Sequence, residues 1–152
     1  MERRNFLRVA AGAGAAMIVA PHALFAAAPP VVMTVYKTPT CGCCKEWVAR
    51  MEQAGFTVKA VDMEDLAEVK HSAGVPKELE ACHTALVGTY VVEGHVPADL
   101  VRKMLREKPK FTGLAVPGMP AGSPGMEQGN ARQAYRVMSF VRDGKSRVYA
   151  SR

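Results

Sequence analysis

Three cysteines within four positions, in the box Cys41-Gly42-Cys43-Cys44, are the feature that most constrains this chain. The β-branched and aromatic run Val31–Tyr36 precedes the box and is typical of a strand. Residues 42–54 carry apolar side chains at helical spacing, and Phe56–Val61 alternates apolar and polar side chains like a second strand. We therefore expect the cysteines to open a helix that connects two strands.

This strand, cysteine box, helix and strand resemble the start of a thioredoxin-like domain. The resemblance implies an α/β fold with a mixed sheet, flanking helices and an inserted loop or hairpin segment. The Asp143-Gly144 pair lies between Ala134–Val141 and Ser146–Ala150 and predicts a hairpin. Residues 109–133 are rich in glycine and proline, and we expect a long loop there without a strand or helix of useful length.

The first 28 residues have the layout of an export signal. Arg3-Arg4-x-Phe6-Leu7 resembles a twin-arginine motif, and a small, apolar run follows it. A membrane anchor is the alternative, but the uninterrupted apolar run is shorter than the ~20 residues that a spanning helix needs. With cleavage after Ala28, residues 29–152 form a single soluble, periplasmic domain with no further membrane association. No basic run with interleaved aromatic residues occurs, so nucleic-acid binding is not expected.

The spacing Cys41-x-x-Cys44 is that of thiol redox centres, and a helix N-terminus favours thiolate. A dithiol enzyme needs only these two, whereas Cys43 adds a third sulfur that suits metal binding. Cys43 and Cys44 project about 100° apart on a helix, which favours several metal ions bridged by thiolates over one enclosed ion. Two alternatives stay open: a thiol–disulfide oxidoreductase using Cys41 and Cys44, and a structural domain with disulfides Cys41–Cys44 and Cys43–Cys82.

Other soft or borderline ligands lie further along the chain. Cys82 and His83 are adjacent, although a lone cysteine also suits core packing. His95 lies between the strand-like run Thr84–Val92 and a helix predicted from Pro97 to about Lys108, where a cap or surface role is the alternative. Met119 and Met126 are each flanked by glycine and proline, and they either bind metal or fix the loop to the core. Thiolate, thioether and imidazole together favour copper over zinc.

These residues lie in motifs that, taken together, resemble the CopG-type family of small periplasmic metal-binding proteins tied to bacterial copper resistance. The motifs are the cysteine box, Cys82-His83-Thr84-Ala85, Glu93-Gly94-His95-Val96-Pro97-Ala98, and the two Gly/Pro-framed methionine segments. The resemblance implies a thioredoxin-like core that binds several copper ions, with a change of their redox state as a further expectation. It implies thiolate ligands at Cys41, Cys43, Cys44 and Cys82, with His83, His95, Met119 and Met126 in matching motifs. Copper ions and other periplasmic copper-handling proteins are the expected partners.

Overall fold

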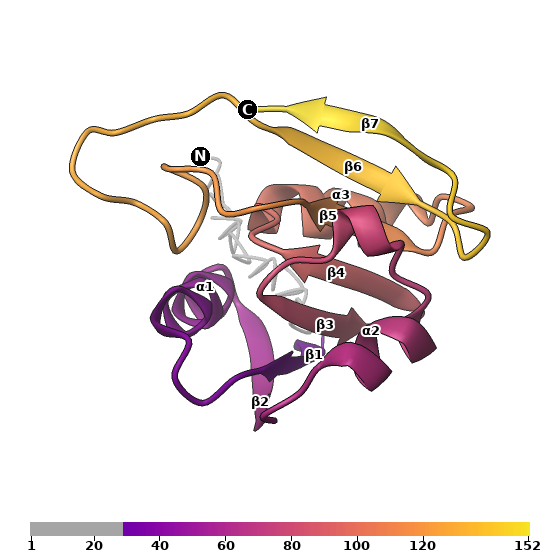
Figure 1. Cartoon of the computed structure of the whole chain (residues 1–152), viewed down its shortest axis with the longest axis horizontal. Helices are drawn as coiled ribbons and strands as arrows, with labels where there is room; N and C mark the ends of the chain where they lie inside the picture. The colour runs from indigo at the N-terminus through magenta and orange to yellow at the C-terminus, as the bar shows by residue number, and fades with distance from the viewer. Residues whose placement is uncertain (1–28) are drawn as a thin grey trace, which may run out of the picture.

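The computed structural model describes residues 29–152, which form one seven-stranded sheet with helices on both faces (Figure 1). The predicted export signal, residues 1–28, lies outside the described residues. In chain order the elements are β1 (Val31–Lys37), α1 (Gly42–Gln53), β2 (Phe56–Asp62), α2 (Ala67–Ala73), the 3-10 helix η1 (Lys77–Leu79), β3 (His83–Val87), β4 (Tyr90–Gly94), α3 (Ala98–Glu107), β5 (Gly113–Val116), β6 (Arg136–Phe140) and β7 (Ser146–Ser151).

The sheet is mixed, with the strand order β2-β1-β3-β4-β5-β6-β7. Strand β1 runs parallel to β2 and antiparallel to β3, and β4 runs parallel to β5. Helix α1 connects the parallel pair β1 and β2, as expected from the cysteine box and its flanking runs. The predicted α/β class, with a mixed sheet and flanking helices, is confirmed. The finer name, thioredoxin-like, stays a prediction.

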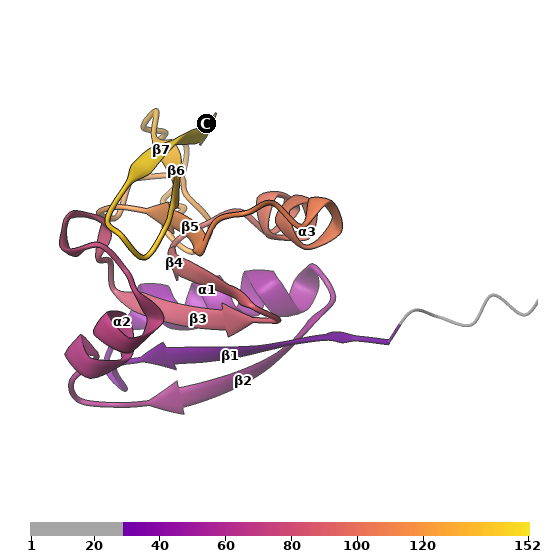
Figure 2. The ribbon, with the colours of Figure 1, turned by 90° about the vertical axis from the view of Figure 1, so that its right-hand side faces the viewer.

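Each face of the sheet is covered by different helices (Figure 2). Side chains of α1 and α3, including Trp47, Met51 and Met104, pack with Met33 and Val35 on one face. Residues of α2, η1 and the segment between them pack with strand residues of the other face in a smaller cluster: Ala73, Val75, Leu79, Val91, Ala115 and Phe140. No helix within residues 29–152 is long and apolar enough to cross a membrane.

One prediction about the fold is wrong. Residues 109–133 contain strand β5, four buried residues that pair with β4 on one side and with β6 on the other. A strand that is covered on both faces has a short apolar run without alternation in its sequence. Here the glycines and prolines around that run indicate a loop, so the strand was not predicted. Strand β5 joins the predicted β6–β7 hairpin to the sheet, so the remaining loop is residues 117–135.

Candidate metal centre

The N-terminus of α1 presents three sulfur atoms. Cys41 occupies the N-cap position, and a disulfide joins it to Cys44 with a Cα–Cα distance of 5.3 Å. The Cys43 thiol is free, and its Sγ lies 3.5 Å from Sγ of Cys41. Cys44 is fully buried, whereas Cys41 and Cys43 are partly exposed. The box is therefore a disulfide-bonded pair with a third, free thiol beside it.

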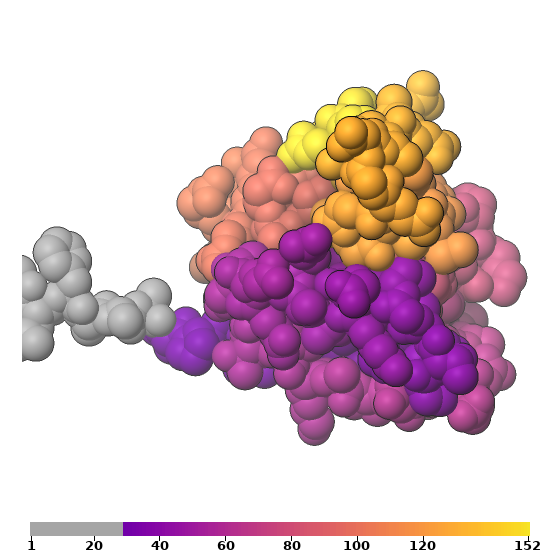
Figure 3. Space-filling model, turned by 90° about the vertical axis from the view of Figure 1, so that its left-hand side faces the viewer, coloured from indigo at the N-terminus to yellow at the C-terminus, as the bar shows by residue number. Residues whose placement is uncertain are grey.

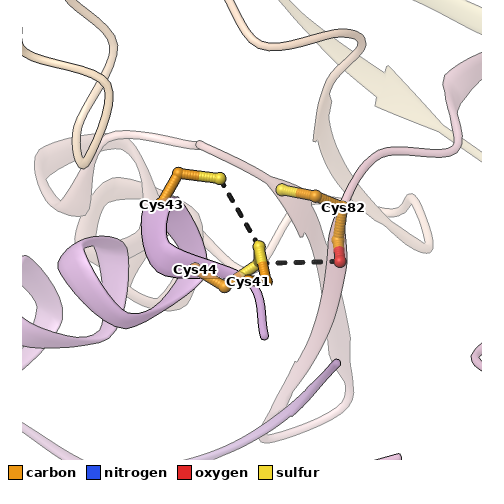
Figure 4. A group of neighbouring side chains, drawn as sticks. All are labelled: Cys41, Cys43, Cys44 and Cys82. Atoms are coloured by element: carbon orange, nitrogen blue, oxygen red, sulfur yellow. Dashed lines mark hydrogen bonds between the residues drawn. A yellow bond between two sulfur atoms is a disulfide. The ribbon is translucent and has the colours of Figure 1, made fainter. Parts of the chain in front are cut away.

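Cys82 completes the group, although it is 38 residues from Cys44 in the sequence. It directly precedes β3, and the antiparallel pairing of β1 with β3 brings it beside the end of β1. Its carbonyl oxygen lies 3.7 Å from Sγ of Cys44, and its free side chain points toward Cys43 (Figure 4). All four sulfurs lie within 4.8 Å of one another. The disulfide Cys43–Cys82 of the structural alternative is not formed, because both thiols are free.

Two buried imidazoles lie behind Cys82. Its Sγ is 3.1 Å from Nε2 of His95 and 3.4 Å from Nδ1 of His83. Nδ1 of His95 donates to the carbonyl oxygen of Pro124 at 2.8 Å, so the neutral ring turns the lone pair of Nε2 toward Cys82. His83 stacks against Trp47 with ring centroids 4.4 Å apart, and its Nε2 has no hydrogen-bond partner among the described residues. Cys82, His83 and His95 thus form a second group of possible ligands that shares one sulfur with the first.

Burial sets the protonation of this second group. It raises the pKa of the Cys82 thiol to about 12, and the neighbouring Cys43 adds to the rise. Burial also lowers the pKa of His83 and of His95, and in His83 the nearby His95 and Lys70 lower it further. Both imidazoles are therefore neutral at pH 7, which is the form that binds metal ions.

The loop after β5 lies directly against α1 (Figure 3). A Cβ atom at Gly125 would lie 2.6 Å from the amide nitrogen of Trp47 and 2.9 Å from the carbonyl oxygen of Cys43, so the backbones touch. Glu127 forms an ion pair with Arg50 of α1 at 3.2 Å. This loop brings Sδ of Met119 to 3.9 Å from Sγ of Cys43, and Met119 is 55% exposed.

The two methionines are not equivalent. Met126 is partly buried, its backbone N–H donates to Ser123 and its carbonyl accepts from Gly122. Its sulfur makes no hydrogen bond to any of the four cysteines within the described residues. Met119 is thus the methionine that the fold brings to the sulfur cluster.

Sequence reasoning missed a buried polar network beneath Cys82. Lys70 of α2, Thr84 of β3 and Glu93 of β4 are all buried and form hydrogen bonds to one another. Burial raises the pKa of the Glu93 carboxyl, although Lys70 and three hydrogen bonds oppose the rise. The one sequence signal for this network was the position of Glu93 directly after the apolar residues of β4. A glutamate at that position is more simply interpreted as the exposed end of a strand.

Fold and site together define a small mixed α/β protein with a thiol-rich candidate metal centre. Comparison with known proteins narrows this class. Residues 79–126 match the family model described as "Protein of unknown function, DUF411". Two solved structures, "Copper resistance protein copG- Form 2" and "Copper resistance protein copG- Form 1", each match with 43% sequence identity and a TM-score of 0.76. Each alignment covers 81% of this chain and 98% of the other. No protein with a curated description matches significantly.

The chain belongs to the family of the copper resistance protein CopG, because identity and coverage are both high over nearly all of those structures. The resemblance inferred from the cysteine box and the other motifs is confirmed.

Proposed function

We propose that this protein binds Cu(I) in a multinuclear thiolate site formed by its four cysteines, and that it acts in copper tolerance. The observation that carries the proposal is the convergence of four sulfurs within 4.8 Å, three from the start of α1 and one from the start of β3. The name of the related structures, copper resistance protein, supports a copper-related role.

The donor set fits copper. Thiolate and thioether sulfurs are the soft ligands that select Cu(I), and Sδ of Met119 lies 3.9 Å from Sγ of Cys43. Zinc is the competing occupant, since four thiolates also form a tetrahedral zinc site. The exposed thioether favours copper, because zinc sites in proteins use thiolate, imidazole and carboxylate. We propose His83 and His95, which lie beside Cys82, and Met126 as secondary ligands.

Copper loading requires the dithiol state of the box. The disulfide Cys41–Cys44 is opened by a thiol reductant, which supplies two electrons and two protons. Binding then displaces the thiol protons, so the affinity for Cu(I) rises with pH. The positive N-terminus of α1 stabilises the thiolates of the box.

The test is an anaerobic titration of the reduced protein with Cu(I) against a chromophoric Cu(I) chelator, with zinc titrated in parallel. We expect more than one copper per chain, and a loss of bound copper in Cys43→Ser and in Cys82→Ser. His71→Ala serves as a control, because His71 is exposed on α2. A copper content near zero, tighter binding of zinc, or full copper binding by Cys43→Ser would sink the proposal.

A second candidate function is thiol–disulfide exchange. The observation that favours it is the disulfide Cys41–Cys44 at a helix N-terminus, with Cys41 partly exposed. The dithiol form would reduce a protein disulfide and be oxidised to Cys41–Cys44 in the same step. Insulin reduction that survives Cys43→Ser and Cys82→Ser, and that copper inhibits, would support this function. Absence of insulin reduction by the wild-type protein would exclude it.

We also propose export to the periplasm through residues 1–28, with other periplasmic copper-handling proteins as partners. The support is the Arg3-Arg4-x-Phe6-Leu7 motif followed by an apolar run. Replacement of both arginines by lysine is expected to retain the protein in the cytoplasmic fraction. Equal periplasmic amounts of the two forms would contradict a twin-arginine route.

A further inference from the structure

A buried carboxylate lies directly beneath the segment that supplies Cys82. The Glu93 side chain has 0% exposure, and its Oε1 accepts a hydrogen bond from Nζ of Lys70 at 2.5 Å. Its Oε2 accepts from the hydroxyl of Thr84 at 2.7 Å, and Nζ of Lys70 also donates to Oγ1 of Thr84 at 3.0 Å. Helix α2 and strands β3 and β4 thus meet at one charged group.

The same carboxylate holds the backbone next to Cys82. Oε1 of Glu93 accepts from the N–H of Ala81 at 2.7 Å, and Thr84 is the second residue after Cys82. One side chain therefore fixes the chain on both sides of Cys82-His83. The next residue, Gly94, adds a close approach, since a Cβ atom there would lie 2.6 Å from Cβ of Ala81.

Stability alone gives little reason for this arrangement. Removal of two charges from water is unfavourable, and replacement of a buried ion pair by well-packed apolar side chains often leaves the stability unchanged. An apolar pair, however, offers no acceptor for the Ala81 N–H. What Glu93 adds over an apolar side chain is therefore this acceptor, and with it a fixed position for the segment that supplies Cys82.

We propose that Glu93 is a positioning residue that holds the sulfur of Cys82 against the sulfurs of α1, with Lys70 as its ion-pair partner. The proposal deepens the proposed function and rests on it, in that Cys82 is taken to be a ligand of the same copper site. The sulfur position itself is measurable without any metal.

The experiment uses the Cys41→Ser/Cys44→Ser background, which leaves Cys43 and Cys82. In a glutathione redox buffer one glutathione disulfide oxidises the two thiols to a Cys43–Cys82 disulfide and leaves as two glutathione thiols. The equilibrium constant gives the effective concentration of one sulfur at the other. Two matched changes are then compared: Lys70→Met/Glu93→Gln, which keeps an acceptor for Ala81, and Lys70→Met/Glu93→Leu, which does not.

Both changes remove the ion pair, so a merely structural role predicts the same effective concentration in both. We expect the glutamine variant to stay within about twofold of the background, and the leucine variant to fall about tenfold, the worth of one buried hydrogen bond. Equal values in two folded variants would overturn the proposal.

Ala81→Pro provides a second test in case the leucine variant does not fold. It deletes the N–H donor and leaves Lys70, Thr84 and Glu93 in contact, and Glu80 already has the extended backbone that precedes proline, with φ −56° and ψ 136°. We expect the same tenfold loss, and an unchanged effective concentration would refute the proposal. A copper titration of the same changes in the four-cysteine protein separates the two questions. Absence of copper binding by the wild type contradicts the proposed function alone, whereas the disulfide equilibrium tests Glu93 independently.

Discussion

Replacement of Gly125 by alanine tests how the loop after β5 is held over the cysteines. Gly125 has φ +85°, and an added Cβ would meet three backbone atoms of α1: Trp47 N at 2.6 Å, Cys43 O at 2.9 Å and Trp47 Cα at 3.0 Å. None of these atoms can rotate away, so either the loop or the start of α1 must shift. Gly118 is a matched control in the same loop, because it has φ +75° and no atom within 4 Å of an added Cβ.

The expected magnitudes follow from this difference. A non-glycine residue in the left-handed region costs about 1–2 kcal/mol, and this cost applies equally to both positions. The contacts at Gly125 add a packing strain of about 1–3 kcal/mol. We therefore expect Gly118→Ala to lower the free energy of unfolding by about 1 kcal/mol and Gly125→Ala by about 3 kcal/mol.

The assay is urea denaturation of both variants and the wild type, followed by Cu(I) competition on the reduced proteins. Because the shifted loop carries Met119, we expect Gly125→Ala to weaken copper binding more than Gly118→Ala does. If Gly125→Ala proves no more destabilising than Gly118→Ala, the inference that this loop rests on the backbone of α1 is wrong.

Three further predictions concern single side chains. Lys70→Met leaves the Glu93 carboxylate buried without its counter-ion, so we expect a loss of about 3 kcal/mol or more in urea unfolding, and addition of Glu93→Gln should recover much of it. A pKa near 12 leaves about one Cys82 thiol in ten thousand ionised at pH 8. Iodoacetamide should therefore label Cys43 first in the protein with the Cys41–Cys44 disulfide, and the labelling rate of Cys82 should rise steeply from pH 8 to pH 10. Equal labelling rates of Cys43 and Cys82 at pH 8 would contradict the raised pKa. In the same chelator competition, Met119→Leu should weaken Cu(I) binding roughly tenfold, whereas the control Met63→Leu should leave the binding unchanged. Equal effects of the two substitutions on Cu(I) binding would exclude a direct role of the Met119 thioether.

Local patterns in the sequence were enough to predict much of the fold. The predicted first strand, cysteine helix and second strand correspond to β1, α1 and β2. They could be predicted because the spacing of apolar residues and the glycine that ends the helix are local signals, each contained in the element itself. The hairpin at Asp143-Gly144 is also present, with Gly144 at φ +87°. Strand β5 was missed because its four residues are stabilised by β4 and β6, and that information does not lie in their own sequence.

The candidate site was less predictable than the fold. The sequence places Cys41, Cys43 and Cys44 on one turn, but their spacing does not predict a fourth converging sulfur. Cys82 was in the predicted ligand set because of its neighbour His83 and the family resemblance. Convergence of Cys82 depends on the register between β1 and β3, which are more than 40 residues apart. The difference between Met119 and Met126 likewise depends on the path of a loop, and the two have similar Gly/Pro surroundings in the sequence.

The register between β1 and β3 is itself fixed by the two different faces of the sheet. Lys37 pairs with His83, and the next residues on each strand toward the sheet interior, Tyr36 and Thr84, pair with each other. His83 faces α1 and stacks on Trp47, whereas Thr84 faces α2 and bonds to Glu93. A slip of one residue would turn each side chain to the opposite face, leaving a hydroxyl against Trp47 and an imidazole between Lys70 and Glu93. Both contacts therefore select the register that brings Cys82 beside the start of α1, so the two faces of the sheet together determine where the fourth sulfur lies.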